Sequence, residues 1–369
     1  MPTKLPSIVD ATKDYERWLG QQMPLVSEDL REKHRSMRKD PLSFLRATFY
    51  RWSQLWPVVC PDLTTAPVVL AVGDLHLENF GTWRDPEGRL IWGVNDFDEA
   101  YRLPYTQDLV RLAVSAKVAI DEHHLNLKPR QACDAILTGY MKALRTGGEP
   151  FVLSERHIWL GKLAYNSERA PRQFWAKLKN KLRPVEGVIP QQVHTVLQAL
   201  MPASGLKWKI QHGAAGLGSL GRPRYTALTQ WQGGIVAREA KALTPSACAW
   251  ARTGRVDVTI FYQSIMDHAV RCRDPFVHVQ GHWLVRRLSP HCSRIELESL
   301  TKTQDEDELL EAMGFETANV HLGTPKMRRV VLQDLGRRKG KWLRAATKAM
   351  TEATITDWKA WKSRKIKAR

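Results

Sequence analysis

The chain has 369 residues, 43% of them hydrophobic and 25% charged, with five scattered cysteines and a formal net charge of +18. No apolar run reaches the roughly 20 residues that a membrane-spanning helix needs, no apolar signal core opens the chain, and no C-x-x-C pair occurs. These features argue against membrane and disulfide-rich secreted classes and favour a cytoplasmic protein of two domains or one large two-lobed unit.

The first half of the chain alternates helical patterns with short strands. Residues 10–39 are charged and helical in pattern, and residues 40–56 predict a buried amphipathic helix with Asp40 as its N-cap. The apolar run in "APVVLAVGDLH" predicts a strand, and the turn at 86–88 predicts a hairpin. Residues 106–121 form a clear amphipathic helical pattern, and further helices are expected between about 127 and 200.

The pattern changes near residue 205, where glycines and β-forming residues become frequent. A glycine-rich loop, a strand, a tight turn at Gly233-Gly234 and a second strand are expected, followed by a helix over 256–272. A hairpin turning at Gln280-Gly281 comes next, and the chain is helical in pattern again from 304.

This order predicts an α+β fold in four segments. They are an amino-terminal helical segment (1–70), a catalytic-loop half (71–204), a β-rich glycine-loop lobe (205–290), and carboxy-terminal helices with a basic tail (291–369).

Polar residues cluster in "VGDLHLENFGTW" (72–83), "NDFDEA" and "LPYTQDLVRL". Asp74 and Asn79 stand five residues apart in one loop, and the hairpin brings Asp96 back beside them. Phosphoryl transfer needs a carboxylate near the attacking hydroxyl and hard oxygen ligands for Mg²⁺. The pattern therefore predicts a phosphate and Mg²⁺ site. The competing interpretation is a loop held by Asp and Asn hydrogen bonds to the backbone.

These motifs resemble the catalytic core of the aminoglycoside and choline phosphotransferases, which are protein-kinase-like enzymes. The resemblance implies that Asp74 is the catalytic base, that Asn79 is a metal ligand and that Asp96 is the principal Mg²⁺ ligand. It implies that Asp108 is a buried carboxylate supporting the loop, together with His76 of the loop motif. Asp98 is either a further metal ligand or structural. Val72 stands where that family has the first histidine of its loop.

The chain also resembles the bacterial family called domain of unknown function 2252, over most of residues 31–360. The motifs that carry this resemblance are "SFLRATFYRW", "GDLHLENFG", "NDFDEA", "GLGSLG", "REAKA" and "FETANVHLGT", in this order. This resemblance supplies a fold relationship but no substrate.

A second motif, "GLGSLG", provides candidate phosphate-binding residues: Gly216, Gly218, Ser219 and Gly221. A strand follows it, which fits a kinase-type glycine loop better than a dinucleotide fold. On the next strand, Arg238 and Lys241 are the candidate phosphate-binding cations. They face opposite sides of a strand, and the sequence favours Arg238.

The glycine loop comes about 140 residues after Asp74, whereas in kinases it precedes the catalytic loop. We therefore expect a circularly permuted, two-lobed kinase-like fold. The predicted function is phosphoryl transfer from ATP, with Mg²⁺, to an unidentified hydroxyl on a small molecule or a protein. Transfer of a nucleotidyl group instead stays open.

Two alternatives remain. The first is a nucleotide-binding regulator without catalysis, like a pseudokinase, which the missing loop histidine favours. The second is a nucleic-acid-binding protein that uses the basic tail, since residues 326–369 hold 15 Lys or Arg and three acidic residues. No nucleic-acid motif accompanies this charge, so a solvated helical face ranks ahead of it.

Overall fold

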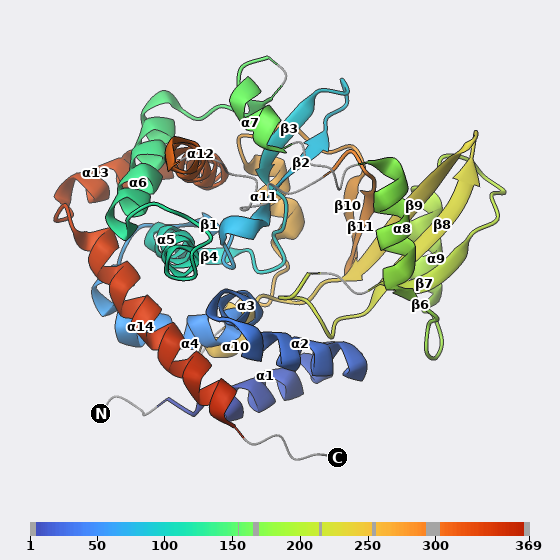
Figure 1. The fold of residues 1–369 in the computed structure, drawn as a ribbon, viewed down its shortest axis with the longest axis horizontal. Coiled ribbons are helices and arrows are strands. Elements are labelled where there is room, and N and C mark those ends of the chain that lie inside the picture. The colour runs from blue at the N-terminus through green and yellow to red at the C-terminus, as the bar shows by residue number, and fades with distance from the viewer. Residues whose placement is uncertain are drawn as a thin grey trace.

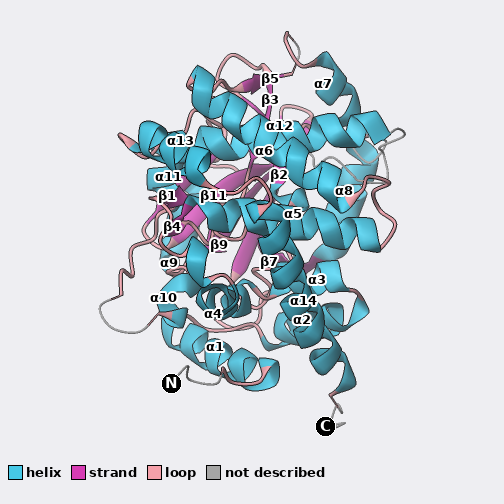
Figure 2. Ribbon diagram, turned by 90° about the vertical axis from the view of Figure 1, so that its left-hand side faces the viewer, coloured by secondary structure: helices cyan, strands magenta, loops and turns pink. Residues whose placement is uncertain are grey.

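The computed structural model describes residues 5–153, 155–164, 170–213, 216–252, 256–292 and 303–364. It combines many helices with antiparallel sheets, in agreement with the predicted α+β class. Figure 1 shows a helical body on one side and a large sheet on the other, and the turned view in Figure 2 shows helices packed around the strands. Within the described ranges, no helix is long and apolar enough to cross a bilayer.

Four helices open the chain: α1 (Ile8–Gln22), α2 (Ser27–Lys39), α3 (Pro41–Ala47) and α4 (Phe49–Val59). Asp40 caps α3 as predicted, accepting a hydrogen bond from Ser43 N at 2.6 Å. The single helix expected over 40–56 is in fact two. The break falls at Thr48, whose backbone leaves helical geometry and whose hydroxyl donates to Phe44 O at 2.7 Å.

A hairpin brings the predicted loops together. Strands β2 (Phe80–Arg84) and β3 (Leu90–Val94) pair so that Phe80 lies opposite Val94. Asn79 immediately precedes β2 and Asn95 immediately follows β3, so the pairing brings these two residues together. Asn95 N donates to Asn79 O at 3.0 Å. Strand β1 (Val68–Ala71) pairs with β4 (Tyr101–Pro104) and leads into the loop of residues 72–79, called the catalytic loop after its predicted role. This loop ends in the short 3₁₀ helix η2 (Leu77–Asn79). Another 3₁₀ helix, η1 (Pro61–Leu63), precedes β1.

Long helices form the body behind this loop. They are α5 (Tyr105–Asp121), α6 (Pro129–Thr146), α12 (Thr303–Leu322), α13 (Met327–Arg337) and α14 (Trp342–Ser363). Helices α6 and α12 cross very closely at two glycines. A Cβ on Gly139 would lie 1.8 Å from Glu311 O, and one on Gly314 would lie 2.1 Å from Ile136 O. Strand β5 (Phe151–Val152) adds to the β2–β3 hairpin, and α7 (Ile158–Ala164) follows it.

The second layer is a six-stranded sheet in the order β10-β11-β9-β8-β7-β6. Its strands are β6 (Leu182–Arg183), β7 (Lys209–Gly213), β8 (Arg224–Trp231), β9 (Gly234–Ala242), β10 (Val277–Gln280) and β11 (Trp283–Leu288). Because β6 precedes residue 205, the sheet includes residues outside the β-rich lobe predicted over 205–290. Helix α9 (Gln191–Ala199) packs on it through Val193, Val196 and Leu197, in a small core separate from that of the helical body. Helix α8 (Pro171–Lys181) precedes β6.

Two short helices connect β9 to β10: α10 (Ala247–Ala251) and α11 (Tyr262–His268). The helix predicted over 256–272 is wrong in extent, because only α11 is helical there. Val256, Val258, Thr259 and Ile260 precede it, and such β-branched residues disfavour helix by restricting side-chain rotamers.

The described part of the basic tail forms two helices, α13 and α14, as expected from the sequence. Trp361 of α14 is fully buried, and α14 contacts α5, α4 and α2. Arg344 of α14 binds Asp134 at 2.6 Å, and Asp357 of the same helix binds Arg51 at 2.6 Å. Part of the tail's charge therefore has a structural role.

Candidate functional site

A buried carboxylate holds the catalytic loop at the end of β1. Asp108, in the first turn of α5, has no exposed surface and accepts hydrogen bonds from Val72 N at 2.7 Å and Gly73 N at 2.9 Å. His321 Nε2 lies 3.0 Å from the same carboxylate. Gly73 has a φ of +82°, and a Cβ there would lie 2.2 Å from Glu99 O, so this position requires glycine.

Asp74 projects from this loop into a cavity and is paired with a buried arginine. Arg111 Nε donates to Asp74 Oδ1 at 2.8 Å, and Arg111 Nη2 donates to the same oxygen. The guanidinium lies over the rings of Phe49 and Trp52, with no exposed side-chain surface, whereas Asp74 keeps 15% of its side chain exposed. Burial raises the pKa of Asp74 to about 7, although Arg111 opposes this rise.

Two other polar side chains of the loop, those of Asn79 and His76, form hydrogen bonds within it. Asn79 Nδ2 donates to Asp74 O, which keeps the two residues of the D-x-x-x-x-N motif together. His76 is buried, and its Nδ1 accepts from Glu78 N at 3.2 Å. His76 therefore helps to shape the turn that carries Asn79.

Asp96 and Asp98 follow β3 and face a lysine from the sheet. Lys241 Nζ lies 3.5 Å from Asp96 Oδ1 and forms a shorter ion pair with Asp98. The side chain of Asp96 is 35% exposed and that of Asp98 only 8%, so Asp96 is the more accessible carboxylate. Arg222 Nη1 lies 3.6 Å from Asp98 and restricts it further.

The two carboxylates differ in their electrostatic surroundings. Burial alone would raise the pKa of Asp96, but Lys241 and Arg286 outweigh it and hold this pKa well below its usual range. Burial and the neighbouring Asp96 charge raise the pKa of Asp98 to about 6. Asp96 therefore loses its proton at a lower pH than Asp98, and both carboxylates are mostly ionised at neutral pH.

The structure places the two candidate cations of β9 on opposite faces of the sheet. Arg238, which the sequence favoured, points to the opposite face, where its Nε donates to Leu200 O at 2.7 Å and its guanidinium lies over Phe276. Lys241 alone of the two lies with the carboxylates. Glu239, on the same face as Lys241, pairs with Arg224 and Arg286.

The glycine loop lies directly over the catalytic loop. A Cβ added to Gly218 would lie 3.3 Å from Asp74 Oδ2 and 3.2 Å from Arg46 O. Gly216 and Gly221 have φ values of +76° and +97°, which favour glycine. Ser219 Oγ accepts from Arg224 Nη2 at 3.0 Å, which joins the loop to β8.

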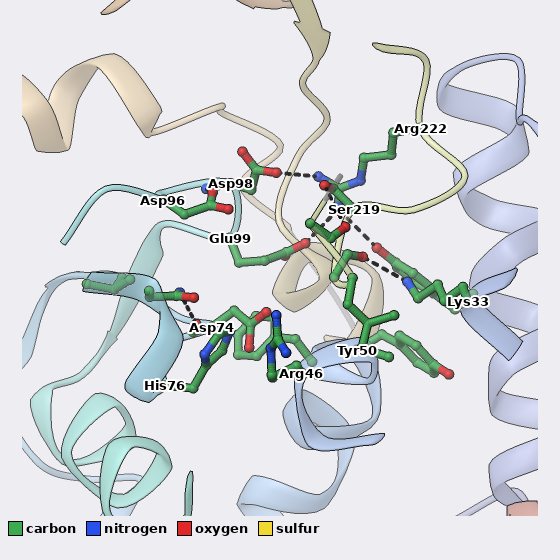
Figure 3. A pocket seen from close by; sticks show the side chains of 18 residues that line it. Lys33, Arg46, Tyr50, Asp74, His76, Asp96, Asp98, Glu99, Ser219 and Arg222 are labelled. Carbon is green, nitrogen blue, oxygen red and sulfur yellow. Dashed lines mark hydrogen bonds and ion pairs between the residues drawn. The ribbon is translucent and has the colours of Figure 1, made fainter. Parts of the chain in front are cut away.

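Two cavities meet at this point. The narrower one lies beneath the glycine loop, and Figure 3 shows Asp74, Asp96 and Asp98 on one wall and Lys33 and Tyr50 on the other. Its empty space is about 620 Å³, part of it open to solvent. The wider cavity, with about 2000 Å³ partly open to solvent, shares Asp96 and Gly216 with it. Its other lining residues include Phe97, Lys241, Tyr262, Met266 and Arg286.

Sequence reasoning missed several charged residues of this site. Arg222 Nη2 binds Glu99 Oε1 at 2.6 Å, and Glu99 Oε2 accepts from Ala247 N at 2.6 Å. Arg111 carried one signal, since it is a charged residue within an otherwise apolar helix pattern. Lys33 carried none, because it lies in the charged pattern of residues 27–39.

The donor set suits Mg²⁺ only if other ligands complete it. Among the described residues, no group of three or more His, Cys, Asp or Glu side chains is placed to hold a metal ion. Mg²⁺, however, is commonly held by one or two carboxylates together with water and substrate phosphates. Asp96 and Asn79, which line the same cavity, provide hard oxygen donors of this kind.

Comparison with known proteins supports the resemblance to the uncharacterised family over one segment. Residues 25–181 match the model of the family described as "Uncharacterized protein conserved in bacteria (DUF2252)". This segment of the chain is therefore similar to that family. It covers the catalytic loop, Asp96 and Asp108, and ends before the glycine loop. No curated protein and no solved structure matches the chain significantly.

Proposed function

We propose that the protein is an ATP- and Mg²⁺-dependent phosphotransferase that acts on a hydroxyl acceptor. One observation carries this proposal. The loop with Asp74 and Asn79, the carboxylate of Asp96, the glycine loop and Lys241 come from distant parts of the chain and line two cavities that meet. These are the parts that kinase-type phosphoryl transfer requires.

The two cavities suggest how the substrates divide between them. The wider cavity offers aromatic and apolar side chains for a nucleoside, with Lys241, beside Asp96, for the phosphates. Asp96 and Asn79 would hold Mg²⁺, which neutralises phosphate charge when it is bound. The acceptor hydroxyl would lie in the narrower cavity, next to Asp74.

The proposed transfer breaks one P–O bond, forms another and moves one proton. The acceptor oxygen forms a bond to the γ-phosphorus while the bond from that phosphorus to the β–γ bridging oxygen breaks. The hydroxyl proton passes to the Asp74 carboxylate, and ADP leaves. A pKa of about 7 suits Asp74 to this role, because a general base works best when its pKa is near the working pH.

The arrangement of the strands supports a permuted kinase-like fold. In protein kinases the phosphate-binding lysine lies on the third strand of the glycine-loop lobe. Here β7, the glycine loop, β8 and β9 follow one another, and Lys241 is on β9. Permutation needs chain ends that lie near each other, and the first and last helices, α1 and α14, are in contact.

A nucleotide-binding protein without catalysis is the second candidate, and the Asp74–Arg111 ion pair favours it. A carboxylate bound to a buried guanidinium is a weaker base. Turnover decides between the two functions.

The experiment measures ADP release with Mg-ATP in the wild type and in Asp74→Asn, and nucleotide affinity in both. The phosphotransferase predicts at least a hundredfold lower release in the variant with nearly unchanged affinity for Mg-ATP. Equal release in the two proteins would rule out Asp74 as the base. Asp121→Asn, an exposed position at the end of α5, is the matched control.

A further inference from the structure

The amino-terminal helices build the wall of the narrower cavity that faces Asp74. Tyr15 comes from α1, Lys33 from α2, Arg46 from α3, and Phe49 and Tyr50 from α4. Figure 3 shows Lys33, Arg46 and Tyr50 around this part of the cavity. This wall supplies cations and aromatic rings, whereas the carboxylates that line the cavity all come from residues 74–99.

Each of those carboxylates already has a cationic partner. Asp74 pairs with Arg111, Asp96 and Asp98 share Lys241, and Glu99 pairs with Arg222. On the helical wall, Arg46 Nη1 binds Glu78 Oε1 at 2.8 Å, which leaves its buried Nε without a hydrogen-bond partner among the described residues. The protein's own cations therefore offset most of the negative charge on this side of the cavity.

Lys33 is the exception in this pairing. Its side chain is buried, and its Nζ donates to Gly218 O at 2.8 Å. In the described part of the chain no carboxylate forms an ion pair with it. Burial lowers its pKa to about 8, so it remains mostly charged at neutral pH. The charges of Glu16, Glu99 and Asp74 act on Lys33 without forming an ion pair with it. A buried cation that lacks an ion-pair partner is costly, and an anionic ligand in direct contact with it would reduce that cost.

We propose that the acceptor is a small hydroxyl compound that carries an anionic group, a phosphate or a carboxylate, and that Lys33 binds this group. The proposal rests on the phosphotransferase function proposed above. It separates this protein from the aminoglycoside and choline phosphotransferases that its catalytic core resembles, because the acceptors in their names are cations. The helical wall has no carboxylate among its described cavity-lining residues that could bind such a cation.

The test measures binding by calorimetry in the full-length protein, with saturating Mg-ADP present. Four probes are compared at equal concentrations: glycerate, glycerol 3-phosphate, glycerol and choline. We expect glycerate, glycerol 3-phosphate or both to bind, and we expect no binding of glycerol or choline. Which of the two anions binds more tightly will show whether the site prefers a carboxylate or a phosphate. Binding of choline or glycerol as tight as that of the anions, or no binding of either anion, would overturn the proposal.

Two lysine variants test whether the anion binds at Lys33. Lys33→Met should weaken anion binding at least tenfold, whereas Lys39→Met, at the exposed end of the same helix, should change it less than twofold. Unchanged anion affinity in a folded Lys33→Met protein would contradict the role of Lys33. If Lys33→Met does not fold, the comparison of the anionic, neutral and cationic probes on the wild-type protein still decides the proposal.

The two proposals fail differently. If the protein binds neither Mg-ATP nor Mg-ADP, the phosphotransferase function is ruled out, and so is the role of the anionic compound as a phosphate acceptor. Binding of the same anions without nucleotide, lost in Lys33→Met, would still support the anion site.

Discussion

Asp74 shows how burial and ion pairing compete at a single residue. Its carboxylate is bound by Arg111, which favours the charged form, yet it is also enclosed by the glycine loop and lies near Asp96 and Glu99. Desolvation is the larger effect, so the folded state favours the protonated form. The sequence shows only an aspartate in a polar loop, because each of these neighbours is brought in by tertiary structure.

This shift predicts a pH dependence of stability. The folded pKa of Asp74, about 7, is above its ordinary value near 4, so between these pH values the folded state binds more protons than the unfolded state. The contribution of Asp74 to the free energy of unfolding therefore falls as pH rises from 5 to 8, by about 2–3 kcal/mol. Urea unfolding of the wild type and Asp74→Asn should show their difference changing by this amount in favour of the variant. A constant difference would contradict the raised pKa.

At the scale of elements, the crossing of α6 and α12 sets the body against which the catalytic loop is built. Gly139 and Gly314 let the two backbones approach closely, and His321, near the end of α12, reaches Asp108. The helices themselves follow from the sequence pattern. Their crossing point does not, because a glycine inside a helical pattern indicates a close approach without naming the partner.

We predict that Gly139→Ala destabilises the protein by about 3 kcal/mol or more, because its Cβ would overlap the backbone oxygen of Glu311 and the helices would have to separate. Gly336→Ala is the matched control. It lies in α13 with no atom within 4 Å of the added Cβ, so it should be neutral or stabilising by up to about 1 kcal/mol. Equal effects of the two substitutions, measured by urea unfolding, would contradict the close crossing.

Helix α2 shows what sequence patterns miss between elements. Asp29 binds His212 of β7 at 2.9 Å and also pairs with Arg183, while Val26 N, just before α2, donates to Gly221 O at 2.9 Å. Together with Lys33, these contacts join the helix to the glycine-loop sheet. The charges of α2 look like those of any solvated helix, and only the fold shows that they are used.

At the scale of the whole molecule, local patterns predicted well what lies close in sequence. The hairpin β2–β3, the helix carrying Asp108 and the strand pair β8–β9 were all expected, because turn residues and apolar periodicity define them locally. The alternation of β9 separated Arg238 from Lys241, but only the packing of α9 on the sheet decides which face meets Asp96. Long-range order of this kind is not encoded in any local window.

The central claim is that Asp96 and its neighbours form a Mg²⁺–nucleotide site. Its most direct test is calorimetric binding of ATP, with and without Mg²⁺, to the wild type, to Asp96→Ala and to the exposed control Asp14→Ala. We predict Mg²⁺-dependent binding to the wild type and the control, weakened at least tenfold in Asp96→Ala. No binding to the wild type, or equal affinity in Asp96→Ala, would contradict the claim.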